Sequence, residues 1–295
     1  MKPPVFRYLD PGGLEEALEL LGEHGDEAKV LVGGQSLMPM LAMRLAYPSV
    51  LIDLNRIDGL EYIRRANGSL EIGALARHSS LEDSTLVTEA CPLIGEAMPR
   101  IGHRAIRNRG TLGGSLAHAD PAAELPAVLT ALGASVTLAK KSRSREVPVD
   151  ELFEMPLVSR LEPDEILTAV HVPSQPAGSG SAVLEVARRH GDFALAGVAA
   201  SACVDSAGRL DQVRLASFGT GPTPVRLRQA EEAVAGAEPT DEALREAGAS
   251  AAGEVDPPGD VHASASYRSA VTEVLVRRAL RAAADQALTA AGQAR

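Results

Sequence analysis

The chain contains two Gly-Gly pairs, each preceded by a short extended segment and followed by an apolar helical pattern. The first lies in VLVGGQSLMPML, residues 30–41, and the second in RGTLGGSLAHAD, residues 109–120. Glycine at such a junction permits a tight turn, or lets another group approach the backbone closely. It also lets successive N–H groups turn inward and bind an anion without any Lys or Arg. Either pair alone is explained by a simple turn, whereas two pairs so flanked favour a dinucleotide whose diphosphate is held from two sides.

Other nucleotide and metal motifs are missing from the sequence. There is no GxxxxGK[ST], and no GxGxxG follows a strand, so a P-loop NTPase and a Rossmann NAD site are unsupported. The two cysteines, Cys91 and Cys203, are far apart and in no CxxC pattern. A disulfide framework, a zinc-cysteine site and a cysteine-ligated iron–sulfur cluster are therefore unsupported as well.

Charge and hydropathy limit the possible partners. The net charge of -10 disfavours non-specific binding to nucleic acid, which needs a basic surface. No apolar run approaches the roughly 20 residues that span a bilayer, and the N-terminus lacks the apolar region of a signal peptide. The sequence predicts a cytoplasmic protein without a membrane span.

The order of apolar patterns predicts an α+β chain of about two domains. Residues 29–32, the first glycine pair, a helix to about residue 45 and a strand over 50–54 form a βαβ-like unit. Hairpins are expected around Asn67-Gly68 and around residues 141–144, and a helix is expected over 121–132 with Asp120 as its N-cap. The segment PSQPAGSGS, residues 173–181, predicts a domain boundary, followed by an antiparallel sheet backed by helices.

The segments that flank both glycine pairs also resemble a known family. KVLVGGQSLMPMLAMRLAYPSVLIDLNRI and IRNRGTLGGSLAHADPAAELPAVL are similar to the FAD-binding (medium) subunit of carbon monoxide dehydrogenase and xanthine dehydrogenase, which are molybdenum hydroxylases. RRHGDFALAGVAA and DPPGDVHASASYRSAVTEVLVRRAL resemble later landmarks of the same subunit. The resemblance implies a two-part FAD-binding domain of the vanillyl-alcohol oxidase-like type over 1–176, with parts at about 1–57 and 58–176. A small C-terminal domain over 177–290 would follow.

The resemblance also implies which residues contact FAD. Two loops would wrap the pyrophosphate. The first contains Leu31, Val32, Gly33, Gly34, Gln35, Ser36 and Leu37, and the second contains Thr111, Leu112, Gly113, Gly114 and Ser115. The remaining positions would contact or lie near the flavin, and they are Ile101, Asp120, Glu124, Leu167 and Phe193.

Several of these side chains have a structural alternative. Phe193 is either an aromatic placed against the isoalloxazine or an ordinary core aromatic, and Ile101 stands where xanthine dehydrogenases carry an aromatic. The spacing of His118 and Asp120 fits a metal or acid–base pair, but helix capping and hydrogen bonding around the cofactor are favoured. Arg188, Arg189 and His190 form either a docking surface or a solvated patch.

The function that the resemblance implies is electron transfer. A molybdopterin-containing large subunit and a small subunit with two-iron two-sulfur clusters would be the partners, and the FAD would pass electrons to an external acceptor. Two alternatives remain: a stand-alone flavin-dependent oxidase or monooxygenase acting on an organic substrate, and a binding module that has lost its flavin.

Overall fold

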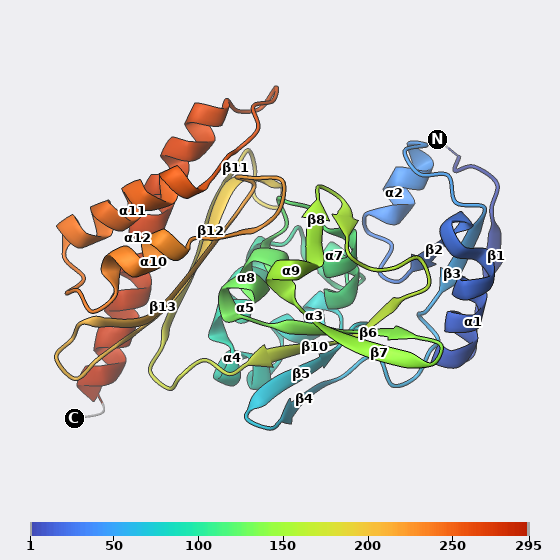
Figure 1. The fold of residues 1–295 in the computed structure, drawn as a ribbon, viewed down its shortest axis with the longest axis horizontal. Coiled ribbons are helices and arrows are strands. Elements are labelled where there is room, and N and C mark those ends of the chain that lie inside the picture. The colour runs from blue at the N-terminus through green and yellow to red at the C-terminus, as the bar shows by residue number, and fades with distance from the viewer. Residues whose placement is uncertain (1, 294–295) are drawn as a thin grey trace.

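The computed structural model, which describes residues 2–293, begins with a small lobe around a parallel sheet, at the right of Figure 1. We call residues 2–57 the first lobe. Its strands are ordered β1-β3-β2, and β3 pairs in parallel with both neighbours. The glycine segment and a helix connect β2 to β3, so the predicted strand–glycine–helix–strand unit is confirmed. The elements are β1 (Arg7–Leu9), α1 (Leu14–His24), β2 (Ala28–Leu31), α2 (Leu37–Ala42) and β3 (Val50–Asp53).

The second lobe, residues 58–173, is built on a five-stranded antiparallel sheet of order β4-β5-β10-β6-β7. Both predicted hairpins are confirmed, and Asn67 and Gly68 take positive φ angles of 50° and 79° at the first of them. Its strands are β4 (Ile63–Ala66), β5 (Ser69–Gly73), β6 (Ser135–Lys140), β7 (Arg143–Pro148), β8 (Phe153–Met155), β9 (Val158–Ser159) and β10 (Ile166–Pro173). Its helices are α3 (His78–Glu82), α4 (Thr85–Ala90), α5 (Pro92–Ala97), α6 (Arg104–Arg107), α7 (Leu112–His118), α8 (Glu124–Leu132) and α9 (Val149–Leu152).

The predicted start of the 121–132 helix is wrong. The helix α8 begins at Glu124 with Ala123 as its N-cap, so Asp120 does not cap it. Instead, Asp120 Oδ1 accepts a hydrogen bond from the N–H of Ala122 at 2.9 Å and stabilises a turn ahead of the helix. Asp120 therefore shapes the connection between α7 and α8.

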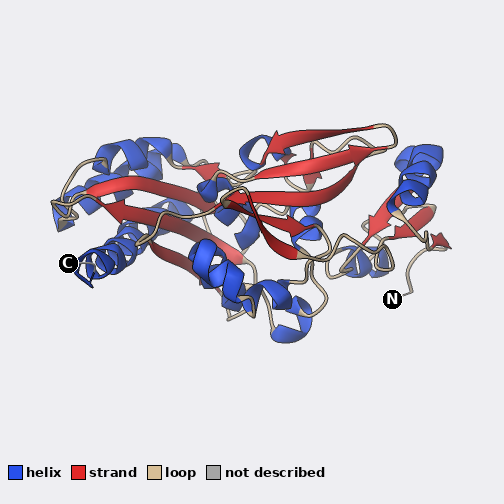
Figure 2. Ribbon diagram, turned by 90° about the horizontal axis from the view of Figure 1, so that it is seen from below, coloured by secondary structure: helices blue, strands red, loops and turns tan. Residues whose placement is uncertain are grey.

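The chain ends in an antiparallel four-stranded sheet covered by helices, as predicted (left of Figure 1). Figure 2 shows the long helix α12 running alongside this sheet. Small residues permit the close contact: a Cβ at Gly180 would lie 1.8 Å from the carbonyl oxygen of Ala283. The elements are β11 (Gly180–Ala187), β12 (Ala194–Val204), β13 (Leu210–Phe218), β14 (Val225–Arg226), α10 (Arg228–Val234), α11 (Asp241–Glu254) and α12 (Ala265–Gln293).

The second lobe and the C-terminal sheet share one hydrophobic core. Val183 and Phe218 of that sheet belong to the same buried cluster as Leu129 and Val170 of the second lobe. Gln175 ties down the segment between them, because its amide Nε2 donates to Ser181 Oγ and Ser201 Oγ at 2.9 and 2.6 Å. Its Oε1 accepts from the N–H of Leu93 at 2.9 Å. The Pro/Gly/Ser-rich segment is thus anchored on both sides.

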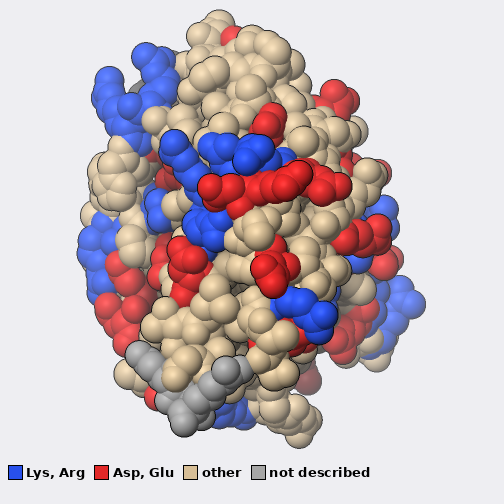
Figure 3. All heavy atoms as spheres, turned by 90° about the vertical axis from the view of Figure 1, so that its left-hand side faces the viewer, with Lys and Arg blue, Asp and Glu red and all other residues tan. Residues whose placement is uncertain are grey.

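Charges on the C-terminal helical face are mixed. Figure 3 shows basic and acidic side chains side by side on this face, without a continuous basic stripe. Among residues 2–293, no helix is both long enough and apolar enough to cross a membrane.

Candidate functional site

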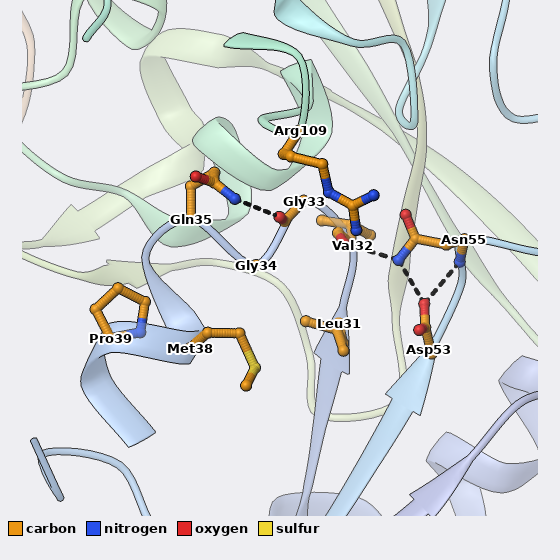
Figure 4. Close-up of a pocket in the computed structure, with 10 residues that line it drawn as sticks. All are labelled: Leu31, Val32, Gly33, Gly34, Gln35, Met38, Pro39, Asp53, Asn55 and Arg109. Carbon is orange, nitrogen blue, oxygen red and sulfur yellow. Dashed lines mark hydrogen bonds between the residues drawn. The ribbon is translucent and has the colours of Figure 1, made fainter. Parts of the chain in front are cut away.

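A pocket of about 310 Å³ lies where β2 gives way to the first glycine pair (Figure 4). Its volume is at the low end for small-molecule sites, which suits one part of a large ligand. Most of its wall comes from the first lobe, and one residue comes from the second. The pocket is lined by Leu31, Val32, Gly33, Gly34, Gln35, Met38, Pro39, Asp53, Asn55 and Arg109.

The first glycine pair serves both as a turn and as a point of close approach. Gly34 has a φ of +70°, a conformation that glycine adopts without strain. Gly33 is approached by the second lobe, since a Cβ there would lie 2.5 Å from the carbonyl oxygen of Arg109 and 2.9 Å from Gly110 Cα. The group that approaches Gly33 is therefore the protein's own backbone, and the two lobes meet at this residue.

The loop after Gly33 leaves backbone donors open. The N–H groups of Gly34, Gln35 and Ser36 donate to no protein acceptor within the part of the chain that the structure describes. The Gln35 side chain folds back instead, and its Nε2 donates to the carbonyl oxygen of Gly33 at 3.0 Å. Consecutive free N–H groups beside an αL glycine are the usual elements of an anion-binding nest.

The second glycine pair differs from the turn that the sequence predicts. Gly113 and Gly114 lie inside the first turn of α7, with Thr111 as the N-cap. Their donors are already used: the Gly113 N–H bonds the carbonyl oxygen of Ala74 at 2.9 Å, and the Gly114 N–H bonds Thr111 Oγ1 at 3.2 Å. A second nest of open N–H groups is therefore not formed here. The hydroxyl of Ser115 makes no hydrogen bond with residues 2–293.

The two glycine pairs nevertheless lie side by side. A Cβ at Gly114 would come within 2.8 Å of Val32 Cγ2, in the first loop. A Cβ at Gly113 would come within 2.6 Å of Ala74 Cβ, so α7 packs directly against the end of β5. Segments about 80 residues apart thus meet beside the pocket because Gly114 has no side chain where Val32 packs.

Arg77 braces this junction from the second lobe. Its Nη1 donates to the carbonyl oxygen of Arg109 and its Nη2 to Asn55 Oδ1, both at 2.6 Å. Asn55 Nδ2 in turn donates to the carbonyl oxygen of Val32 at 2.8 Å. Burial lowers the pKa of Arg77, yet an arginine stays charged at neutral pH, so these are charge-assisted hydrogen bonds. The chain Arg77–Asn55–Val32 fixes the spacing of the two lobes at the pocket.

Residue-level matches to known proteins cover both parts of the chain. Residues 4–175 match the family model described as the FAD binding domain in molybdopterin dehydrogenase, and residues 181–283 match the CO dehydrogenase flavoprotein C-terminal domain. The chain belongs to the FAD-binding medium subunits of the carbon monoxide and xanthine dehydrogenase family. The cofactor of this family is FAD, as the sequence predicts.

Relatives of this medium subunit match over nearly their whole length. The chain is 42% identical to the 6-hydroxypseudooxynicotine dehydrogenase complex subunit alpha of Paenarthrobacter nicotinovorans, over 97% of each chain. It is 36% identical to the carbon monoxide dehydrogenase medium chain of Hydrogenophaga pseudoflava, over 96% of this chain and 98% of that one. A solved chain of carbon monoxide dehydrogenase from Hydrogenophaga pseudoflava superimposes with a TM-score of 0.94 at 38% identity, covering 97% of this chain and 99% of that chain. These relatives are oxidoreductase subunits, and the chain is an oxidoreductase subunit of the same fold.

Among the predicted positions, those of the first loop line the medium subunit's pocket as far as Gln35. Leu167 is buried in the large core, and Ile101 packs against that core. Phe193 is 66% exposed, so the alternative that Phe193 is an ordinary core aromatic is excluded. Glu124 is buried at the start of α8, and burial, followed by the nearby Glu185 and Asp120, raises its pKa to about 8. None of these four residues lines the described pocket.

Several residues at the pocket were not predicted from sequence. Arg109 corrects the expectation that the loop needs no basic residue, since its guanidinium extends across the pocket wall toward Val32 and Asn55 (Figure 4). The sequence contained one signal. Arg109 lies two residues before Thr111 in IRNRGTLGG, and it is therefore placed beside the loop that was predicted to contact the pyrophosphate. The pocket residues missed are Met38, Pro39, Asp53, Asn55 and Arg109.

Proposed function

We propose that the chain is the electron-transferring FAD subunit of a molybdenum hydroxylase. It would accept electrons from iron–sulfur clusters of a partner subunit and pass them to an external acceptor. The observation that supports this most directly is the meeting of both glycine segments at one pocket with open backbone donors. Such donors suit a diphosphate, and the positive φ of Gly34 permits the turn that leaves them unpaired. The described residues therefore fit this part of FAD.

The bound FAD supplies the ability to take up and release electrons, and the protein supplies binding, orientation and the electrostatic environment. In this proposal the N–H groups of Gly34, Gln35 and Ser36 hold the diphosphate. The hydroxyls of Ser36 and Ser115 are free to add hydrogen bonds, and Thr111 caps the helix that carries the second segment. Arg77 and Asn55 keep the two walls at a fixed distance.

The remaining positions are proposed on the family resemblance. We assign Glu124 and Asp120 to the connection beside the cofactor, where a buried carboxyl with a raised pKa stays protonated near neutral pH. Phe193 has the exposure that a residue meeting a flavin ring or a partner subunit needs. The same proposal covers the other predicted contacts, Leu31, Val32, Leu37, Ile101, Leu112, Gly113, Gly114 and Leu167.

The proposed partners are a molybdopterin-containing large subunit and a small subunit with two-iron two-sulfur clusters. Relatives are named as a medium chain or as a subunit of a dehydrogenase complex, which supports a multi-subunit assembly. We also propose that the FAD-binding domain spans 1–176, with parts at about 1–57 and 58–176, and that the C-terminal domain spans 177–290. The end of β10 at Pro173 and the start of β11 at Gly180 support this division.

Spectroscopy of the purified chain tests the proposal. We expect the chain alone to bind FAD, seen as flavin absorbance near 450 nm after reconstitution and desalting. Co-expression with the molybdopterin and iron–sulfur subunits should give a complex that reduces this flavin with substrate. Turnover of an organic substrate with oxygen by the chain alone would instead support a stand-alone oxidase or monooxygenase, and failure to retain FAD would support a binding module.

A further inference from the structure

The guanidinium of Arg109 is a cation without a partner among residues 2–293. Within residues 2–293, its side chain forms no salt bridge and donates no hydrogen bond, although it lines the pocket. Its backbone is fixed, because the Arg109 carbonyl oxygen accepts from Arg77 Nη1 at 2.6 Å. The side chain is therefore anchored at its base and free at its tip.

The two arginines that precede Arg109 in the sequence segment are neutralised by carboxylates, unlike Arg109. Arg104 pairs with Glu82 at 2.7 Å and also with Asp83, and Arg107 pairs with Glu82 at 2.9 Å. These contacts hold α6 against α3 and leave little positive charge for a ligand. Of the three arginines in this segment, Arg109 alone faces the glycine loop.

The one carboxylate on the pocket wall does not neutralise Arg109. Asp53 Oδ2 accepts from the Tyr8 hydroxyl at 2.7 Å, and Asp53 Oδ1 accepts from the Asn55 N–H at 2.8 Å. The hydrogen bond to Asp53 is also the main reason that the pKa of Tyr8 is raised to about 12. The carboxylate is thus occupied within the first lobe, while Arg109, Gly34 and Gln35 line the pocket and neither the guanidinium nor the two N–H groups have a partner among residues 2–293.

We propose that Arg109 is the cationic residue that binds the diphosphate of FAD, reaching from the second lobe to the loop of the first. This inference rests on the FAD site proposed above, and it adds a positively charged side chain to that site. A guanidinium presents several donors to phosphate oxygens in a planar fork, and such charge-assisted hydrogen bonds are stronger than those from neutral N–H groups. The diphosphate would then be held from both lobes: by backbone donors of the first lobe and by a side chain of the second.

Ligand titrations of the apo chain test this inference without any assay of turnover. FAD and ADP are the probes, since both carry a diphosphate, and riboflavin is the comparison because it carries none. In Arg109→Gln we expect the affinity for FAD and for ADP to fall roughly ten- to a hundredfold, the range for loss of a hydrogen bond to a charged group. Riboflavin binding should not change. Arg109→Lys should recover part of the affinity, because it restores the charge without the planar fork.

Two further measurements separate charge from folding. The affinity of the wild-type chain for ADP should decrease with added salt, and this dependence should be weaker in Arg109→Gln. Arg278→Gln, an exposed arginine on α12, serves as the matched control and should bind both ligands as the wild type does. Thermal denaturation checks that all variants are folded.

The outcomes distinguish this inference from the proposed function. If the wild type binds FAD and Arg109→Gln binds FAD and ADP within about twofold of it at low salt, Arg109 is not the diphosphate ligand, while the FAD subunit proposal stands. If the wild-type chain retains no FAD, the proposed function itself fails. Equal losses for riboflavin and ADP in Arg109→Gln would overturn the assignment to the diphosphate.

Discussion

Arg77 joins the two walls of the pocket by donating from Nη2 to Asn55 Oδ1 at 2.6 Å, while its Nη1 donates to the carbonyl oxygen of Arg109. The first wall belongs to the parallel sheet and the second to the segment that precedes α7. This half-buried side chain adds a polar link at the pocket to the apolar contact between the lobes, where Leu75 and Ile166 pack in the core of the first lobe.

Arg77→Met is expected to weaken FAD binding about tenfold or more and to destabilise the fold by about 1–3 kcal/mol, because it leaves two acceptors unpaired. Fluorescence titration with FAD and urea unfolding measure the two effects. Arg64→Met is the control, since Arg64 pairs with Glu71 at the surface and such pairs contribute little. Wild-type FAD affinity in Arg77→Met would show that the brace is not needed for the site.

Gly114→Ala should reduce both stability and FAD affinity, because the added Cβ would meet Thr111 Oγ1 at 2.6 Å and Val32 Cγ2 at 2.8 Å. Gly95→Ala is a matched helical control in which the new Cβ finds nothing closer than 4.0 Å. There we expect a neutral or stabilising effect of up to about 1 kcal/mol from helix propensity. If both variants behave alike in thermal unfolding and FAD titration, the contact between the two glycine segments has no energetic importance.

Glu124 should make the apo chain less stable as the pH rises from about 4.5 to about 8. Its pKa in the folded chain is raised to about 8, mainly by burial, against an ordinary value of 4.5. The folded state therefore favours the protonated carboxyl, and the associated stability is complete below about pH 4.5 and is lost as pH rises through about 8. Urea unfolding at a series of pH values should show this decline, on the order of a few kcal/mol. Glu124→Gln, which cannot ionise, should flatten the profile, and an unchanged slope in that variant would contradict the assignment.

Gln175→Leu should destabilise the chain by about 2–4 kcal/mol, since three hydrogen bonds of one amide are removed and their buried partners stay unpaired. Gln229→Leu on α10, whose side chain is exposed, is the control and should change the free energy of unfolding by less than about 0.5 kcal/mol. If Gln175→Leu lowers the free energy of unfolding no more than Gln229→Leu does, the segment between β10 and β11 is held by other contacts.

Local patterns were sufficient to predict several strands, both hairpins and the first loop. The alternation around Asn67-Gly68 and the apolar run over residues 50–54 are short-range signals, and the structure has a strand or turn at each. The turn at Gly34 could be predicted as well, because glycine adopts a positive φ without strain.

Contacts between distant segments could not be predicted in the same way. Nothing in the local sequence shows that Arg109 lies beside Gly33, or that Arg77 reaches Asn55, since both depend on how the lobes pack. The helix start at Glu124 was missed because Asp120 and Pro121 fit a cap pattern, whereas Asp120 instead bonds Ala122 and prolongs the turn. The donors of Gly113 and Gly114 were expected to face a ligand, but tertiary contacts with Ala74 and capping by Thr111 use them.

The different use of donors in the two glycine segments bears on how the subunit matures. The start of α7 has its shape fixed by hydrogen bonds to Ala74 and Thr111, so it does not depend on a flavin. The loop over residues 33–36 keeps the N–H groups of Gly34, Gln35 and Ser36 available for an incoming ligand. We therefore expect the empty chain to keep a native-like fold and FAD to enter and leave a site that is already shaped.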